Sequence, residues 1–463
     1  MNTNSSNELK HAVVIGGSMA GLLAARVLSD RYRRVTLVER DALGPAIENR
    51  RGVPQGRHTH GLLAGGREAL ERLFPGISGQ LLAAGALAGD IIGESRWFLE
   101  GGYHRSFPSE LVGLLVSRPF LEGMVREHVR ALPNVRFRDN QAIGGLIASE
   151  DKSRVIGVSL SPDKLPADLV VDASGRGSQS PRWLEELGYP RPVEERVEVD
   201  VHYTTRFFRR RPQDAGGNMA LIIPPAAPAG QRGGVALAQE FGRWTVTMVS
   251  HFSAGAPMDL NGFIEFSRSL PAPDIYELVR RAEPIGEAAP YHFPASIRRR
   301  YEKLARFPQG YLVLGDALSS FNPIYGQGMS VAAMEAIELE TVLSRGQQYL
   351  ARRFFARASK VIDVPWSIAV GNDLRMPEAT GNRTLPVKLI NAYMRKLHRA
   401  AHHDAEVTLA FHRVGNLLAP PSSILHPRIA WRVFRQNVLP RFAGPTGAPD
   451  LTPCPQAELG ASE

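Results

Sequence analysis

The sequence predicts an α/β fold in which a Rossmann-like domain carries an inserted antiparallel sheet and is followed by a helical C-terminal region. Three observations predict this organisation. Residues 11–21 (HAVVIGGSMAG) form an apolar run and a glycine turn, which is typical of a strand leading into a helix. Residues 197–208 and 244–248 alternate apolar and polar side chains, as half-buried strands do. From residue 346 onward, the spacing is mostly helical.

The chain has 463 residues, which is more than one simple hydrophobic core accommodates. We therefore expect several closely packed regions, and the Pro-, Gly- and Ala-rich end of the chain is typical of disorder. The expected regions are residues 1–190 (first part of the Rossmann-like domain, in which residues 91–110 are a candidate addition to the inserted sheet), 191–284 (inserted sheet), 285–345 (second part of the Rossmann-like domain), 346–440 (helical region) and 441–463 (disordered tail).

Composition argues against several classes of protein. The formal net charge is +9, but the arginine clusters at 209–211 and 298–300 belong to no nucleic-acid-binding motif, so we expect no nucleic-acid partner. The single cysteine, Cys454, has no partner for a disulfide, and no Cys/His cluster predicts a metal site. Residues 1–8 lack the apolar core of a signal peptide, and no apolar run is long enough to span a membrane. A cytoplasmic protein without integral membrane association is expected.

Other elements follow from local pattern. Helical spacing predicts helices over residues 65–73 and 118–132, and Pro119 suits the first turn of the second. Residues 41–61 are punctuated by Gly and Pro and are expected to form a loop. A further helix begins near Gly328. Continuous apolar runs predict buried strands at residues 111–116, 166–174 and 311–316.

The first glycine turn predicts a dinucleotide-binding site. Gly16 and Gly21 occupy the first and third positions of the pattern G-x-G-x-x-G, and Ser18 occupies the second. The helix that opens on this turn directs backbone N–H groups toward a pyrophosphate. Glu39 ends the next predicted strand, where a carboxylate accepts hydrogen bonds from a ribose diol.

A second glycine-rich turn occupies residues 315–330 (GDALSSFNPIYGQGMS). A predicted strand delivers Asp316 to its C-terminal edge, where the carboxylate could bind a chain of hydroxyl groups. Free N–H groups at the start of the following helix, near Gly328, would face an anion.

Together these segments resemble the FAD-dependent monooxygenases that share the fold of para-hydroxybenzoate hydroxylase. The resemblance covers residues 10–335 and rests on three landmarks in the family's order: the first turn with Glu39, residues 172–175 (DASG), and the second turn. Ala173 departs from the glycine that often follows the aspartate in this family. Residues 50–60 (RRGVPQGRHTH) are similar to a loop of bacterial polyketide epoxidases, such as those of polyether biosynthesis.

The resemblance implies how a cofactor would be held. Glu39 would hold the adenosine ribose, Arg118 would contact the cofactor, and Asp316 would bind its ribitol or pyrophosphate region. The loop containing Arg50 would lie beside the isoalloxazine, and residues 326–329 would direct N–H groups at the flavin N1/O2 edge. The expected cofactor-binding residues are Gly16, Gly17, Ser18, Met19, Ala20, Gly21, Glu39, Arg40, Arg50, Gly52, Val53, Arg118, Asp316, Pro323, Gly326, Gly328 and Met329.

The implied activity is that of an FAD-dependent monooxygenase of bacterial secondary metabolism, with a role in antibiotic biosynthesis. It would transfer one oxygen atom of O2 through a flavin C4a-hydroperoxide and epoxidise an alkene of a polyketide-like small molecule. NAD(P)H would reduce the flavin directly or through a flavin reductase, because no second dinucleotide motif is visible. No catalytic side chain is assigned, although His58 and His60 near the flavin loop are candidates for a proton donor.

Four rival functions stay open at this point. An aromatic hydroxylase of a polyketide often needs a base for a phenol, and no residue is marked for that role. A halogenase is disfavoured because the motif Trp-x-Trp-x-Ile-Pro is absent and no lysine lies between Lys10 and Lys152. A prenyl-chain reductase would saturate its substrate rather than oxygenate it, and a non-catalytic flavin-binding protein would hold FAD without converting a substrate. The substrate cavity is expected between the 195–250 sheet and the C-terminal helices.

Overall fold

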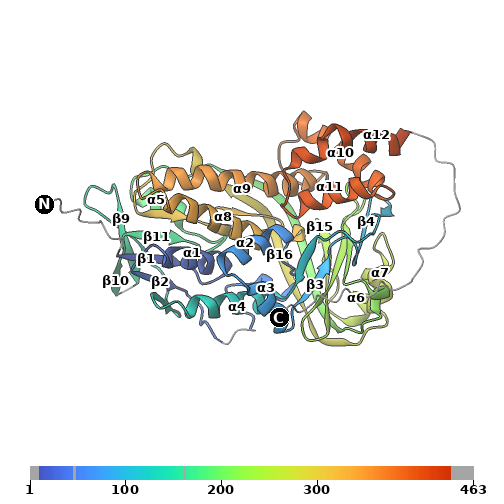
Figure 1. The fold of residues 1–463 in the computed structure, drawn as a ribbon, viewed down its shortest axis with the longest axis horizontal. Helices are drawn as coiled ribbons and strands as arrows, with labels where there is room; N and C mark the ends of the chain where they lie inside the picture. The colour runs from blue at the N-terminus through green and yellow to red at the C-terminus, as the bar shows by residue number, and fades with distance from the viewer. Residues whose placement is uncertain (1–9, 45–47, 161, 439–463) are drawn as a thin grey trace, which may run out of the picture.

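The computed structural model describes residues 10–44, 48–160 and 162–438. It confirms the predicted α/β organisation, with a parallel sheet, an antiparallel sheet and C-terminal helices (Figure 1). The parallel sheet has the strand order β17-β11-β1-β2-β7 and packs between helices, so four of its strands are almost continuously buried, whereas the edge strand β7 (VRFR) alternates in sequence and burial. Its strands are β1 (His11–Ile15), β2 (Arg34–Val38), β7 (Val135–Arg138), β11 (Leu169–Asp172) and β17 (Tyr311–Val313).

Helices cover this sheet. In Figure 1, α8 and α9 run above α1, and α4 lies below β2. The apolar faces of α1, α8 and α9 share one hydrophobic core with the parallel strands. These helices and their neighbours are α1 (Met19–Ser29), α2 (Ala64–Leu73), α3 (Ile77–Ala83), α4 (Arg118–Arg130), α5 (Ser180–Glu186), α8 (Gly328–Leu343) and α9 (Leu350–Asp373).

The second sheet has eight strands in the order β18-β16-β12-β15-β14-β13-β4-β5. Its strands are β4 (Ser95–Leu99), β5 (Gly102–Tyr103), β12 (Glu194–Arg209), β13 (Ala220–Ile223), β14 (Arg232–Gln239), β15 (Arg243–His251), β16 (Pro284–Arg299) and β18 (Ser319–Ser320). The sheet therefore draws strands from beyond residues 191–284, including two from 91–110. One face packs on α6 (Leu260–Arg268) and α7 (Asp274–Val279) around Phe208, Trp244 and Phe263.

Smaller elements connect these layers. A three-stranded antiparallel sheet contains β8 (Gly145–Ala148), β9 (Val155–Leu160) and β10 (Asp163–Pro166), and a two-stranded sheet pairs β3 (Leu87–Asp90) with β6 (Val112–Leu115). Residues 48–61 lack regular structure apart from the 3-10 turn η1 (Pro54–Arg57), in line with the predicted loop. The strand predicted at 311–316 stops at Val313, because the chain turns at Gly315, whose φ is +69°.

Three helices close the C-terminal region: α10 (Leu385–Ala401), α11 (Ala405–Gly415) and α12 (Pro427–Val438). They form a small core of their own and lie at the upper right of Figure 1, beyond the end of α9. Residues 441–463, including Cys454, lie outside the described residues, so the predicted disordered tail is not addressed by the structure. In the part of the chain that is described, no helix has the length and apolar character needed to cross a membrane.

Candidate functional site

One large cavity connects the first glycine turn to the C-terminal helices. Its volume is about 1210 Å³, which exceeds the roughly 300–1,000 Å³ of common ligand pockets and leaves room for a cofactor together with a substrate. Residues of the second sheet and the C-terminal helices line one end, as the sequence predicts. Every expected cofactor-binding residue except Gly17 and Gly21 lines this cavity.

The first turn needs its glycines for close packing. Gly16 has φ +105°, and a Cβ added there would lie 2.4 Å from the Ala173 carbonyl oxygen. A Cβ at Gly21 would lie 1.8 Å from the carbonyl oxygen of Gly16. The helix α1 is therefore seated directly on the turn. Among described residues, no side chain caps its first N–H groups, because the Ser18 hydroxyl donates instead to Glu122 Oε2 at 2.6 Å.

Glu39 lies where the sequence predicts a ribose-binding carboxylate, at the end of β2 beside this turn. Its Oε2 accepts a hydrogen bond from the Gly17 N–H at 2.6 Å, and its Oε1 accepts one from the Asp41 N–H at 3.0 Å. Each carboxylate oxygen has a further lone pair. Glu39 can thus fix the turn and still accept hydrogen bonds from a diol in the cavity.

Arginines surround a buried carboxylate next to the turn. Glu122 is 3% exposed and accepts from Arg50 Nε at 3.1 Å, while Arg118 Nη2 donates to the Ser18 hydroxyl at 2.9 Å. Burial opposes ionisation of Glu122, but Arg118 and Arg50 outweigh it and lower the pKa. Two cations are thereby held at the entrance to α1, where they would meet the charge of a diphosphate.

The loop that contains Arg50 is placed more specifically than the sequence allowed. The Arg50 guanidinium donates to the Gly17 carbonyl oxygen at 3.3 Å and lies 3.4 Å from Glu39 Oε2, so it belongs to the first-turn end of the cavity. Gly52 follows at the cavity wall, and its N–H donates to Asp41 Oδ2 at 2.6 Å. Val53 lines the same wall and is buried.

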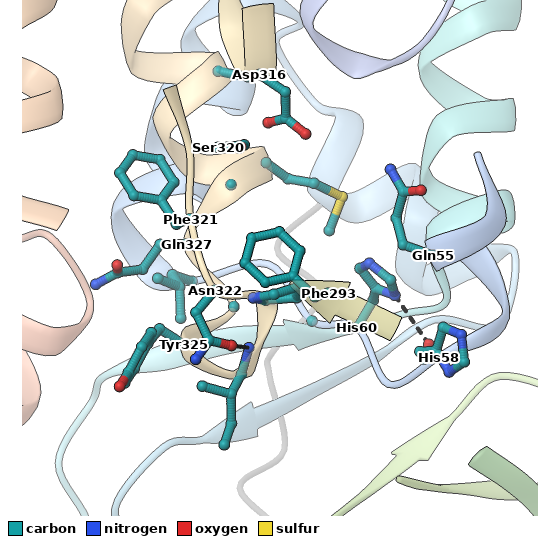
Figure 2. Close-up of a pocket in the computed structure, with 18 of the residues that line it drawn as sticks. Gln55, His58, His60, Phe293, Asp316, Ser320, Phe321, Asn322, Tyr325 and Gln327 are labelled. Atoms are coloured by element: carbon teal, nitrogen blue, oxygen red, sulfur yellow. Dashed lines mark hydrogen bonds between the residues drawn. The ribbon is translucent and has the colours of Figure 1, made fainter. Parts of the chain in front are cut away.

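The second turn presents open backbone to the cavity. Gly326 has φ +64°, and a Cβ at Gly326 or Gly328 would meet no atom within 4 Å among the described residues. The helix α8 begins at Gly328, and no described side chain caps it. Figure 2 shows Asp316 near the start of this turn and Tyr325 and Gln327 further along it. Oε1 of Gln327 is buried and has no hydrogen-bond partner within the described ranges.

Asp316 faces the cavity as the sequence predicts. Its carboxylate makes no hydrogen bond to any described residue, and burial raises its pKa although Arg118 and Arg176 oppose the effect. A hydroxyl donor in the cavity would satisfy this carboxylate. Together with two uncapped helix starts and the arginines, this donor set fits FAD: diphosphate at α1, hydroxyl chain at Asp316, and an anionic ring edge at α8.

His58 and His60 are both held neutral. The two residues are joined by a hydrogen bond between His60 Nδ1 and the His58 carbonyl oxygen at 2.9 Å (Figure 2). Burial lowers the pKa of His58 to about 4 and that of His60 to about 3. His58 Nδ1 also contacts the Thr205 hydroxyl at 2.8 Å. Burial therefore disfavours the imidazolium form of both residues, and both contribute hydrogen-bonding groups to the cavity wall.

Sequence reasoning missed a buried carboxylate that lines the cavity beside the second turn. Asp373, at the end of α9, is 2% exposed, and its Oδ1 accepts from the Tyr325 hydroxyl at 2.7 Å and from Asn322 Nδ2 at 2.9 Å. Its Oδ2 has no partner among the residues the structure describes. Burial raises the pKa of Asp373 to about 7. Asn322 and Tyr325 lie in the second turn and could have been noticed there, but no motif marks Asp373.

Solved structures share this architecture. PqsL of Pseudomonas aeruginosa, an FAD-dependent monooxygenase, is 17% identical, with a TM-score of 0.61 over 79% of this chain and 97% of PqsL. A flavoprotein/dehydrogenase of Cytophaga hutchinsonii is 14% identical, with a TM-score of 0.65 over 93% of this chain and 98% of that protein. The 2-methyl-3-hydroxypyridine-5-carboxylic acid oxygenase is 18% identical, with a TM-score of 0.58 over 89% of this chain and 98% of that protein. The chain therefore has the fold of FAD-dependent monooxygenases related to para-hydroxybenzoate hydroxylase.

A closer relationship appears in sequence. Protein Rv3254 of Mycobacterium tuberculosis is 36% identical over 408 residues, which cover 83% of this chain and 80% of that protein. The chain belongs to the same family as Protein Rv3254. No protein-family model matches the sequence.

Proposed function

We propose that this protein is an FAD-dependent monooxygenase that transfers one oxygen atom of O2 to an apolar, polyketide-like small molecule, with epoxidation of an alkene as the first candidate reaction. The observation that carries the proposal is the continuity of one cavity. It begins at two uncapped helix starts suited to FAD and ends between the second sheet and the C-terminal helices. When bound, reduced flavin supplies the activated oxygen.

The residues at the cofactor end bind and orient. The start of α1 and Arg118 would hold the diphosphate, Glu39 the adenosine ribose, and Asp316 the ribitol chain. Backbone N–H groups near Gly328 would face the N1/O2 edge of the flavin. A helix N-terminus stabilises negative charge there by about 0.3–2 kcal/mol, which favours the reduced cofactor.

The residues at the substrate end exclude water. Phe293 from β16 and Phe321 from the second turn line the cavity (Figure 2), and so do Trp97, Leu99 and Met394. An apolar wall of this kind binds a hydrocarbon skeleton without directional contacts. It also keeps bulk water away from a reactive oxygen donor. These properties suit an alkene substrate, which needs no side-chain nucleophile.

Asp373 supports aromatic hydroxylation as a second candidate. A phenol reacts faster once a base has removed its proton. Asp373 lines the cavity, and its Oδ2 is buried and has no hydrogen-bond partner among the described residues. The Tyr325 and Asn322 hydrogen bonds hold Oδ1 and leave Oδ2 to a substrate hydroxyl. Ionised Asp373 would take that proton. The base that the sequence did not reveal is thus available in the fold.

The first test is reconstitution. Purified protein is loaded with FAD, reduced with NADH or NADPH with and without an added flavin reductase, and exposed to 18O2 with a hydrophobic polyene or a polycyclic phenol. We expect a yellow protein and one 18O atom in the product by mass spectrometry. The reductase arm shows whether NAD(P)H acts directly. A protein that binds no FAD, or that oxidises the reductant without oxygenating any compound, contradicts the proposal.

The second test separates the two reactions. Asp373→Asn keeps the side-chain shape but removes the base, and Glu378→Gln is the matched control because Glu378 is exposed just after α9. If the enzyme hydroxylates phenols, Asp373→Asn lowers kcat by about 10²–10⁴-fold and abolishes the rise in rate through pH 7 that ionisation of Asp373 produces. If it epoxidises alkenes, both variants convert the polyene at the wild-type rate.

A further inference from the structure

A cluster of three potential metal ligands lies on the outer face of the second sheet, away from the cavity. Asp200 and His202 belong to β12, and His292 belongs to β16. Their candidate ligand atoms, one from each residue, all lie within 4.8 Å of one another. The alternate residues Tyr203, Tyr291 and Phe293 line the cavity, so the cluster occupies the opposite side of the same two strands.

Strand pairing creates this cluster. His202 and His292 are direct cross-strand partners, and their rings stack with centroids 4.5 Å apart and an interplanar angle of 16°. Asp200 lies in a register shift between Glu198 and Val201, and its φ of +39° places it in a left-handed conformation. A bulge of this kind re-aims a side chain, and a strained non-glycine residue often marks a functional position.

The spacing suits a small divalent ion. Oδ1 of Asp200 lies 3.4 Å from His202 Nε2 and 2.7 Å from His292 Nε2. Ligand atoms about 2.0–2.2 Å from a tetrahedral ion are about 3.3–3.6 Å apart, so the first pair is already at coordination distance. The second pair forms a hydrogen bond, and it would have to open by less than an ångström when the ion binds.

The exposure of the cluster permits entry and exchange. The side chains of Asp200, His202 and His292 are 44%, 34% and 49% exposed. Three protein ligands would leave a coordination position to water or to an external ligand. Two imidazoles with one carboxylate favour Zn²⁺ and neighbouring transition metals over Mg²⁺ or Ca²⁺, which prefer oxygen ligands alone.

We propose that Asp200, His202 and His292 form a binding site for a divalent transition-metal ion, with Zn²⁺ as the representative ion. This inference is independent of the proposed flavin chemistry. The ion would tie β12 to β16 at the bulge, on the reverse side of the wall that carries Tyr203 and Phe293. Because the ion binds the folded protein through residues from two strands, its binding would also stabilise the fold.

The test is titration of untagged, metal-free full-length protein with ZnCl2 in a calorimeter, paired with thermal melting. We expect one ion per chain and a Tm that rises with zinc concentration. His202→Ala, His292→Ala and Asp200→Asn should each weaken binding by more than the roughly 10–100-fold that the loss of an outer-shell partner costs. Asparagine tolerates the left-handed backbone at position 200, so this variant keeps the fold. His426→Ala, an exposed histidine elsewhere, is the control.

A second readout guards against nonspecific zinc binding. Co²⁺ in a tetrahedral site gives a visible absorption band, which should appear with wild type and with His426→Ala but not with His292→Ala. The proposal is overturned if wild-type protein binds no ion, or if the three cluster variants bind zinc as tightly as wild type. It is also overturned if Tm rises equally with zinc in wild type and His292→Ala.

Discussion

The two ends of the cavity are built differently: backbone turns form the end proposed to hold FAD (the cofactor end), whereas side chains from distant segments form the end proposed to hold the substrate (the substrate end). The first and second turns are short, continuous stretches in which glycines set the path of the chain. The substrate end combines β12, the second turn, α9 and the C-terminal helices, and its polar centre is one carboxylate, Asp373. A site formed by backbone turns can be predicted from the sequence, because its geometry is local. A site formed by side chains from distant segments cannot.

The largest effect is expected at the backbone-determined end. In Gly21→Ala the new Cβ would collide with the Gly16 carbonyl oxygen at 1.8 Å, and the turn can move only by unseating α1. We expect a loss of about 3 kcal/mol or more in the free energy of unfolding, together with loss of FAD. Urea denaturation and the visible spectrum of the purified protein measure both.

Gly79→Ala provides the control for this prediction. Gly79 lies inside α3, where an added Cβ meets no described atom within 4 Å. Alanine there should stabilise the helix by up to about 1 kcal/mol and leave FAD binding intact. If Gly21→Ala and Gly79→Ala had the same free energy of unfolding and bound FAD equally well, the prediction would be contradicted. The first turn would then not be limited by backbone contact.

An intermediate effect is expected at the side-chain-determined end. The unfolded state ionises Asp373 near pH 4, but the folded state holds its proton to about pH 7, so the unfolded state binds fewer protons between these values. The contribution of Asp373 to the free energy of unfolding of the wild type therefore falls as pH rises from 4 to 8. Asp373→Asn removes this dependence. We expect the variant to gain about 1–3 kcal/mol relative to wild type at pH 8 and little at pH 4, by urea denaturation at both pH values.

Glu378→Gln again serves as the control for Asp373→Asn, because it is the same carboxylate-to-amide change at an exposed position just after α9. Parallel pH–stability curves for wild type and Asp373→Asn would show that the buried carboxylate is not protonated in the folded protein. The substrate end would then need a counter-charge that the described residues do not supply.

The smallest effect is expected where the first turn departs from its pattern. Ser18→Gly restores the missing glycine but removes the hydroxyl that joins Arg118 to Glu122. Closer approach of the backbone to the diphosphate would raise the affinity for FAD, whereas the loss of the hydrogen bonds would lower it. The dissociation constant of FAD is measured by quenching of flavin fluorescence. The binding free energy derived from it should change by no more than about 1 kcal/mol. Ser18→Ala, which loses the hydroxyl without gaining backbone freedom, should bind FAD more weakly than Ser18→Gly.

The same contrast explains what could be predicted from the sequence. Local pattern is sufficient for β1, α1, α4 and β12, because apolar periodicity and glycine turns act over a few residues. The joining of β4 and β5 to the second sheet could be predicted only as a candidate, since β4 is half-buried throughout and shows no alternation. Asp373 and the Asp200–His202–His292 cluster depend on contacts between residues far apart in the chain, which no single-sequence pattern encodes.

Strand β16 contacts both ends of the cavity. Its last residues pair with β18, which lies within the second turn, while its middle carries Tyr291 and Phe293 on the cavity side. A substitution that alters the twist of this strand is therefore expected to move both the apolar wall of the cavity and the second turn. If the proposed function holds, substitutions in β16 that change substrate preference would therefore also change the environment of the flavin.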